Sequence, residues 1–144
     1  MLYHGIDTIE INRIGLAVAR WGDRFLRRVW TDGELADADG RLPSLAARFA
    51  AKEATAKALG CGLRGLGAGA ARTPMAVGWR EIEVVRAASG QPLLRLHGQA
   101  AAHAAALGWD SMALSLTHTA GLAMASVVAS ARQPRKTNPK EPVW

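Results

Sequence analysis

The spacing of hydrophobic and polar residues changes along the chain, and these changes predict where strands and helices lie. Residues 2–11, LYHGIDTIEI, combine β-branched and apolar residues as a strand does. Asn12 is placed to cap a helix over residues 13–20, because asparagine is a favoured N-cap. Gly22 breaks that helix, and residues 24–30 then resume a helical pattern. This part of the chain is therefore predicted to be a strand followed by an interrupted helix.

Two further helices are predicted in the middle of the chain. Thr31 and Glu34 fit the S/T-x-x-E pattern of a capping box, which opens a short helix. Pro43 suits the first turn of a long helix that ends near Gly60, because proline is accepted at a helix start and glycine ends helices. This long helix contains RFAAKEATAKALG, in which charged side chains stand among alanines.

The second half of the chain predicts two hairpins and one more helix. Residues 62–78 are rich in glycine and alanine without a clear period, which is typical of a loop. Strand patterns flank the turn SGQP within residues 81–97, and a second pair of strands, 111–118 and 122–130, follows a short helix over residues 98–108. The order β-α-α-α-β-β-α-β-β predicts an α+β fold, with a mainly antiparallel sheet packed against the long helix.

Length and composition indicate one domain with a short tail. The chain has 144 residues, and after residue 131 it becomes basic and rich in proline, RQPRKTNPKEPVW. We therefore expect a folded domain over residues 1–131 and a disordered tail over residues 132–144. Cys61 is the single cysteine, which excludes an intramolecular disulfide and a cysteine-based zinc site. The N-terminal residues lack the pattern of a signal peptide and no stretch is long enough to span a membrane, so we expect a cytoplasmic protein.

The net charge of +6 indicates an anionic partner. A set of arginines would share one side of a helix if residues 13–28 were continuous, namely Arg13, Arg20, Arg24, Arg27 and Arg28. Such a stripe could dock an acidic helix, although a soluble surface in an arginine-rich protein explains it equally well. Neither aromatic residues interleaved on strands nor a recognisable nucleic-acid motif accompanies the charge, so nucleic-acid binding is not expected.

Two carboxylates are candidates for a metal site. Asp7 lies near the end of the first predicted strand and Glu53 lies in the middle of the long helix, and Mg²⁺ typically takes one or two protein carboxylates. The sequence does not itself bring the two together. The alternative is that Asp7 caps a turn and that Glu53 forms an i,i+4 ion pair with Lys57.

Basic residues near these carboxylates could hold a phosphorylated ligand. Lys57 shares a helix face with Glu53, and Arg48 and Lys52 form a neighbouring stripe. They could surround a diphosphate, but the spacing alone favours a solvated helix face. His118 lies where a predicted strand meets its turn in SLTHT, a place where a lone histidine is more often structural than catalytic.

Four segments together resemble a known family. GIDTIEINRI, RFAAKEATAKALG, SGQPLLRLHG and ALSLTHT stand in the order and spacing of the holo-[acyl-carrier-protein] synthase family, the small bacterial type of 4′-phosphopantetheinyl transferase. The resemblance covers about residues 3–130, and it is the pair formed by the first two segments that makes it specific. It implies a 4′-phosphopantetheinyl transferase fold in the predicted domain.

The resemblance also implies an activity and its residues. Members move 4′-phosphopantetheine from coenzyme A to a serine of apo-acyl carrier protein for fatty acid biosynthesis, with Mg²⁺, and release adenosine 3′,5′-bisphosphate. By resemblance, Asp7 and Glu53 are the metal ligands, and together with Lys57 they are the catalytic residues. Lys57 also lies near the coenzyme A phosphates, and Arg48 and His118 border the coenzyme pocket.

The resemblance further implies partners. Arg13, with Arg20 and Arg24 as companions, matches the helix that binds the acidic carrier. Larger members of the superfamily contain two copies of the fold, so a single copy is expected to form a homotrimer with active sites at its subunit interfaces. The acceptor of the serine proton stays open between a metal-bound water and a carboxylate such as Glu10. Two other functions also stay open: transfer to carrier domains of polyketide or peptide synthases, and polyanion binding without catalysis.

Overall fold

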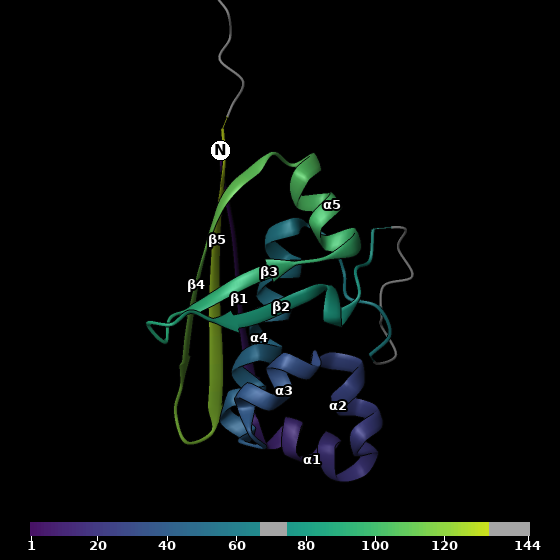
Figure 1. The fold of residues 1–144 in the computed structure, drawn as a ribbon. Coiled ribbons are helices and arrows are strands. Elements are labelled where there is room, and N and C mark those ends of the chain that lie inside the picture. The colour runs from purple at the N-terminus through teal and green to yellow at the C-terminus, as the bar shows by residue number, and fades with distance from the viewer. Residues whose placement is uncertain (67–74, 133–144) are drawn as a thin grey trace, which may run out of the picture.

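A computed structural model describes residues 1–66 and 75–132, and it shows one long helix lying against an antiparallel sheet (Figure 1). Strand β1 (Leu2–Glu10) pairs with β5 (Leu122–Ala131), which pairs in turn with β4 (Trp109–His118). Strands β2 (Ile82–Arg86) and β3 (Pro92–Leu96) form a separate hairpin. All these pairings are antiparallel, so the predicted α+β class and both predicted hairpins are confirmed.

Helices connect and cover these strands. The α-helices are α1 (Ile11–Trp21), α2 (Asp23–Val29), α3 (Asp32–Ala38), α4 (Leu42–Leu59) and α5 (Gly98–Ala106), and a 3₁₀ turn, η1 (Trp79–Glu81), precedes β2. Four α-helices, rather than the expected three, therefore lie between β1 and β2.

The extra helix arises at Gly22, where a φ of 54° ends α1 and separates it from α2. The prediction that Asn12 caps the first helix is wrong. The N-cap is Glu10, whose side chain forms no capping hydrogen bond, and the helix begins at Ile11. Asn12 is therefore inside the first turn of α1.

The predicted capping box and the predicted ends of the long helix are confirmed, whereas the helix predicted to close at Gly108 ends at Ala106. Thr31 accepts a hydrogen bond from the Glu34 backbone at 3.2 Å, and the Glu34 carboxylate accepts one from the Thr31 backbone at 2.9 Å. Pro43 lies in the first turn of α4, and Gly60 ends that helix in the left-handed conformation with a φ of 70°. Local sequence is thus sufficient to set these boundaries.

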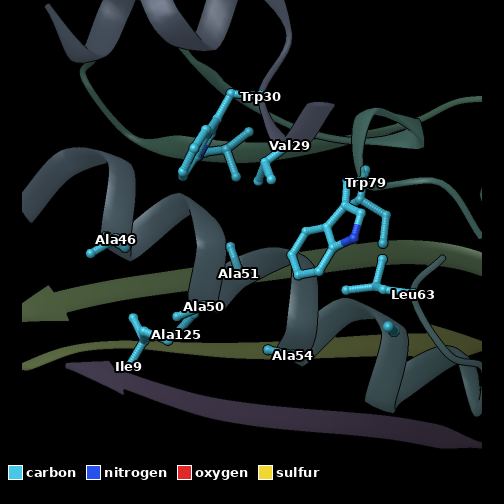
Figure 2. Packing of buried hydrophobic residues seen from close by; sticks show 14 of the residues in the cluster. Ile9, Val29, Trp30, Ala46, Ala50, Ala51, Ala54, Leu63, Trp79 and Ala125 are labelled. Carbon is cyan, nitrogen blue, oxygen red and sulfur yellow. The ribbon is translucent and has the colours of Figure 1, made fainter. Parts of the chain in front are cut away.

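The small residues of α4 let the helix approach the sheet closely. Ala46, Ala50 and Ala54 are fully buried, and Figure 2 shows Ala50 beside Ala125 of β5 and close to Ile9 of β1. A Cβ atom on Gly5 would collide with the backbone of Ala54. Only glycine at position 5 therefore allows β1 to lie this close to α4.

The long predicted loop is anchored at its two ends. Leu63 and Val77 form a parallel bridge, and the Arg64 amide donates to the Val77 carbonyl at 2.9 Å. Residues 67–74 of this loop and residues 133–144 of the predicted tail lie outside the described residues. In the part of the chain that is described, no helix has the length and apolar character needed to cross a membrane.

Candidate active site

A pocket of about 590 Å³ opens between β1, α1 and α4, and it brings the two candidate carboxylates together. Asp7 and Glu53 both line it, although 45 residues separate them in the sequence. Asp7 stands opposite Ala125, which is 1% exposed, so the alternation of β1 directs Asp7 to the face of the sheet that packs on α4. The close contact at Gly5, two residues earlier, brings this part of β1 against α4.

Lys57 joins the same pair of elements. Its Nζ donates to Asp7 Oδ1 at 2.8 Å and to the Ile6 carbonyl at 3.0 Å. The alternative ion pair between Glu53 and Lys57 is absent from the salt bridges of the described residues, and Lys57 pairs with Asp7 instead. This contact ties the end of α4 to β1 beside the pocket.

The surroundings of Glu53 in this pocket disfavour the ionised form of its carboxyl group. Burial raises the pKa of the Glu53 carboxyl, the nearby Asp7 charge raises it further, and Lys57 partly opposes both effects. Ionised Glu53 therefore gains more than an exposed glutamate would from a cation placed between it and Asp7. Among the described residues, no group of three or more His, Cys, Asp or Glu side chains could hold a metal, so this pocket offers two carboxylates and no third protein ligand of these types.

The lining of the pocket is both charged and apolar. Arg13 lines it together with the two carboxylates. Its aromatic lining residues include Trp21 and the pair Phe49 and Trp79, whose ring centroids are 4.6 Å apart. These aromatic residues were not among the candidates from the sequence, because they converge only where α1, α4 and η1 come together. The arrangement suits a ligand with an anionic head and a less polar arm.

A second pocket, of about 410 Å³, holds the other two candidate residues. Arg48 and His118 line it, and so do Arg41 and Arg86, which sequence analysis missed. His118 is exposed at the end of β4, where the sequence placed it. The extra arginines come from the start of α4 and from β2, and no sequence spacing links them. Three arginines and one histidine line this pocket, which makes it suited to anionic groups.

Arg48 is buried rather than solvated. It is 4% exposed, forms an ion pair with Asp37, and donates to the Ser44 carbonyl at 3.2 Å. Arg86 shares the same Asp37 carboxylate at 3.3 Å. Burial lowers the pKa of the Arg48 guanidinium, and the Asp37 charge opposes this effect. The favoured interpretation of Arg48 as part of a wet helix face is therefore wrong.

The two pockets lie on different sides of α4. Arg48 and Glu53 are five positions apart, which separates them by about 140° around a helix of 3.6 residues per turn. No residue lines both pockets. Within one chain, Asp7, Glu53 and Arg13 therefore line one pocket, and Arg48 and His118 line a different one.

Lys52 is also buried, with an exposure of 0%. Its Nζ donates to Glu34 Oε2 at 2.7 Å, to the Ile82 carbonyl at 2.5 Å and to the Trp79 carbonyl at 3.1 Å. Glu34 Oε1 in turn accepts from the Val84 amide at 2.9 Å. Burial lowers the pKa of Lys52, and Glu34 opposes this effect. The solvated-face interpretation is wrong for Lys52 too, which instead joins α3, α4 and β2.

The arginine stripe is exposed but not continuous. Its five residues are exposed on α1 and α2, namely Arg13, Arg20, Arg24, Arg27 and Arg28. The break at Gly22 divides them between the two helices, so the condition under which they would share one side of a single helix is not met. The Arg20 guanidinium lies 4.7 Å from the ring centroid of Trp21, which is 54% exposed. Of this set only Arg13 lines the first pocket, together with Trp21, beside which Arg20 lies.

Glu10 does not reach the first pocket. It stands opposite Leu122 on the exposed side of β1 and β5, whereas Asp7 faces α4. It is also absent from the lining of the pocket.

Comparison with known proteins gives consistent results. A family model described as the 4′-phosphopantetheinyl transferase superfamily matches residues 4–125. The holo-[acyl-carrier-protein] synthase of Chloroflexus aurantiacus is 58% identical over 134 residues, covering 90% of this chain and 98% of that protein. The enzyme of the same name from Herpetosiphon aurantiacus is 54% identical over 128 residues, covering 89% and 98%.

Solved structures agree with these relatives. The holo-[acyl-carrier-protein] synthase of Helicobacter pylori, in complex with coenzyme A, superposes with a TM-score of 0.73 and 30% identity, covering 88% of this chain and 99% of that one. The enzyme of that name from Neisseria meningitidis gives a TM-score of 0.74 and 31% identity, covering 89% and 97%.

Proposed function

Because the chain belongs to the 4′-phosphopantetheinyl transferase superfamily, we propose that it is the enzyme that converts apo-acyl carrier protein to the holo form for fatty acid biosynthesis. It transfers 4′-phosphopantetheine from coenzyme A to a carrier serine. The observation that carries this proposal in the structure is one pocket lined by Asp7, Glu53 and Arg13, with Lys57 bound to Asp7.

The donor set of this pocket fits Mg²⁺. Asp7 and Glu53 are two hard oxygen ligands, the number that Mg²⁺ commonly takes from a protein while water and phosphate oxygens complete its octahedron. Asp7 and Glu53 would hold the ion. When bound, it supplies positive charge that offsets the negative charge developing on the diphosphate oxygens.

The reaction itself is a phosphoryl-type transfer. The carrier serine Oγ forms a bond to the β-phosphorus of coenzyme A, and the bond from that phosphorus to the oxygen bridging it to the α-phosphorus breaks. The bridging oxygen leaves with adenosine 3′,5′-bisphosphate, and the serine proton passes to a base. Such transfers depend mainly on positioning and on charge stabilisation.

The residues of the pocket divide these tasks. Lys57 binds and orients Asp7, and its ammonium group would lie beside the phosphates of a bound coenzyme. Glu53 would hold the ion together with Asp7, and a bound cation favours its ionised form, so Glu53 is proposed as a metal ligand and not as the acceptor of the serine proton. Glu10 faces away from the pocket, so it is not proposed as the base.

The separation of the two pockets supports active sites shared between copies of the chain. The basic pocket with Arg48 and His118 suits the coenzyme phosphates, yet it lies around the helix from Glu53. A neighbouring copy can supply this pocket to the first one if the subunits form a ring. We therefore propose a homotrimer in which each site uses Asp7, Glu53 and Lys57 of one subunit and Arg48 and His118 of the next.

Shared sites predict complementation between two defective variants. Glu53→Gln damages one pocket and His118→Ala the other, so each protein alone should transfer slowly at low coenzyme A. When they are co-expressed and mix at random, roughly a quarter of the sites combine two intact halves in a ring of identical subunits. We expect that fraction of native activity in the mixture. A mixture no more active than the average of its two components would contradict shared sites.

The carrier is proposed to dock on the exposed arginines of α1 and α2. Arg13 is exposed and lines the pocket, and Arg20 and Arg24 are exposed nearby in the sequence. Arg13→Glu should raise the KM for the carrier about tenfold or more at low salt, with a small effect on the KM for coenzyme A, because screening weakens exposed charge contacts. Steady-state kinetics at two ionic strengths measure this. An equal rise in both KM values would contradict the assignment.

The direct test is mass spectrometry of apo-acyl carrier protein after incubation with this protein, coenzyme A and Mg²⁺. We expect a gain of one phosphopantetheine group on the carrier. No gain with any acyl carrier protein would overturn the proposal. Substitution of carrier domains from polyketide or peptide synthases, with kcat/KM measured for each, tests the alternative substrates.

Two further points remain proposals. Cys61 is a free thiol, as is usual in reducing compartments, and we propose that the enzyme acts in the cytoplasm. The catalytic domain is proposed to comprise residues 1–131. Arg132, where the predicted tail begins, pairs with Asp110 at 3.2 Å.

A further inference from the structure

A single residue, Asp37, contacts all three arginines that line the second pocket. Its backbone carbonyl accepts a hydrogen bond from Arg41 at 2.9 Å, and its carboxylate forms ion pairs with Arg48 and, at 3.3 Å, with Arg86. The three arginines line the pocket, whereas Asp37 is absent from its lining. Asp37 can therefore influence a bound anion mainly through the arginines that it holds.

The three arginine charges do not gather in one pocket without compensation. Burial lowers the pKa of the Arg48 guanidinium, the charges of Asp37 and Glu34 oppose this effect, and the charges of Arg86 and Arg41 add to it. Arg86 and Arg41 thus repel Arg48, and Asp37 offsets part of that repulsion before any ligand is bound.

The guanidinium of Arg48 is held at two points. One Nη atom donates to the Ser44 carbonyl at 3.2 Å, and the other donates to the Asp37 carboxylate. The residue is 4% exposed, so its side chain has little freedom to move. Because Arg48 is already ordered, a bound anion does not have to immobilise it, and affinity increases accordingly.

The position of Asp37 in its own helix gives no local reason for a carboxylate. It lies in the last turn of α3, where the helix dipole favours a basic residue, and that turn has none. The charge of Asp37 therefore does not stabilise the end of its helix. The charged side chains that it meets among the described residues are Arg48 and Arg86, which both line the pocket.

We propose that Asp37 is a positioning residue of the second pocket, and that it holds Arg41, Arg48 and Arg86 together as one binding group for the phosphates of coenzyme A. The identity of this ligand rests on the proposed function. Asp37 acts through the arginines and not on the reacting atoms. Its loss should therefore weaken coenzyme binding and leave the chemical step unchanged.

Asp37→Asn tests this role, because it removes the charge but keeps the backbone carbonyl that binds Arg41. We expect the Kd for adenosine 3′,5′-bisphosphate, measured by calorimetry, and the KM for coenzyme A each to rise about tenfold. The kcat and the KM for the carrier should stay within about twofold of native. Tighter binding of the bisphosphate would show that Asp37 only reduces the positive potential, and it would overturn the proposal. A fall in kcat as large as the rise in KM would show a structural role and would overturn it too.

Two further variants control this experiment. Asp32→Asn makes the same change at the other end of α3, where Asp32 pairs with Arg80 at 3.7 Å and lines neither pocket, so it should leave the Kd unchanged. Asp37→Glu keeps the charge and should bind the bisphosphate more tightly than Asp37→Asn does. Binding no tighter than in Asp37→Asn would show that the carboxylate charge does not matter at this position, and it would contradict the proposal.

A double-mutant cycle tests whether Asp37 acts through Arg48. In an Arg48→Gln protein, adding Asp37→Asn should change the Kd for the bisphosphate by about threefold or less, because the main arginine that Asp37 holds is already lost. The same tenfold factor in both backgrounds would show that the two residues act independently.

Binding of the bisphosphate needs no carrier, so the two proposals fail separately. A protein whose bisphosphate affinity depends on Asp37 but that never modifies a carrier would refute the transferase and leave the positioning role standing. Carrier modification together with native bisphosphate affinity in Asp37→Asn would refute the positioning role alone.

Discussion

Glu53→Gln and Asp7→Asn each lower kcat/KM for the carrier by about 10³-fold or more, the size expected when a group that stabilises transition-state charge is lost. Both carboxylates line one pocket, and each substitution removes one of the two negative charges that would hold the proposed cation there. Carrier modification followed by mass spectrometry over a series of Mg²⁺ concentrations measures the loss. Turnover close to native in either variant would refute the metal site.

Two controls separate chemistry from folding in this experiment. Asp39→Asn makes the same change at an exposed helix end whose φ of 49° asparagine also accepts, so it should leave activity unchanged. Glu10→Gln tests the other carboxylate that the sequence offered as a base. Its position away from the pocket predicts normal turnover at pH 8. A large loss of turnover would show that Glu10 takes part in the reaction.

Glu53→Gln should also make the metal-free protein more stable at pH 8. The pKa of Glu53 is raised in the folded state, so the folded protein holds this proton more tightly than the unfolded chain. The ionised carboxylate therefore costs stability once pH rises through the raised pKa, and that cost is absent below the ordinary pKa. A gain in Tm at pH 8 that disappears at acid pH would show that the variant is folded while inactive.

Lys52→Met should destabilise the fold by about 3–5 kcal/mol, because it leaves the buried Glu34 carboxylate without its cation. Both side chains are 0% exposed in this ion pair, and the Lys52 ammonium also donates hydrogen bonds to the Trp79 and Ile82 carbonyls. Urea unfolding at a fixed protein concentration measures the loss. The concentration is fixed because assembly contributes to apparent stability.

Lys57→Met is the matched control for Lys52→Met. Lys57 lies on the same helix and also binds a carboxylate, but its side chain is 55% exposed, so its loss should cost less than about 1 kcal/mol. Adding Glu34→Gln to Lys52→Met removes the remaining buried charge and should recover part of the stability. Equal losses for Lys52→Met and Lys57→Met would contradict a buried ion pair.

The sequence by itself determined the elements and the family. Strand alternation, the capping box at Thr31, proline in the first turn of α4 and glycine at its end all act within a few residues, so local spacing reveals them. The four motifs also pointed to the family that the relatives confirm. Where a local signal competed with another, as at Asn12 and Glu10, the boundary shifted by two residues.

Only the tertiary structure decided what the charges of α4 do. Lys52 is buried because its ammonium group binds Glu34 and the carbonyls of Trp79 and Ile82. Arg48 is buried against Asp37. All these partners lie at least 11 residues away in the sequence. The separation of the two pockets likewise depends on how the sheet and α4 pack. Helical spacing places a side chain around its own axis, but whether that side chain meets water, a partner element or another copy depends on long-range packing.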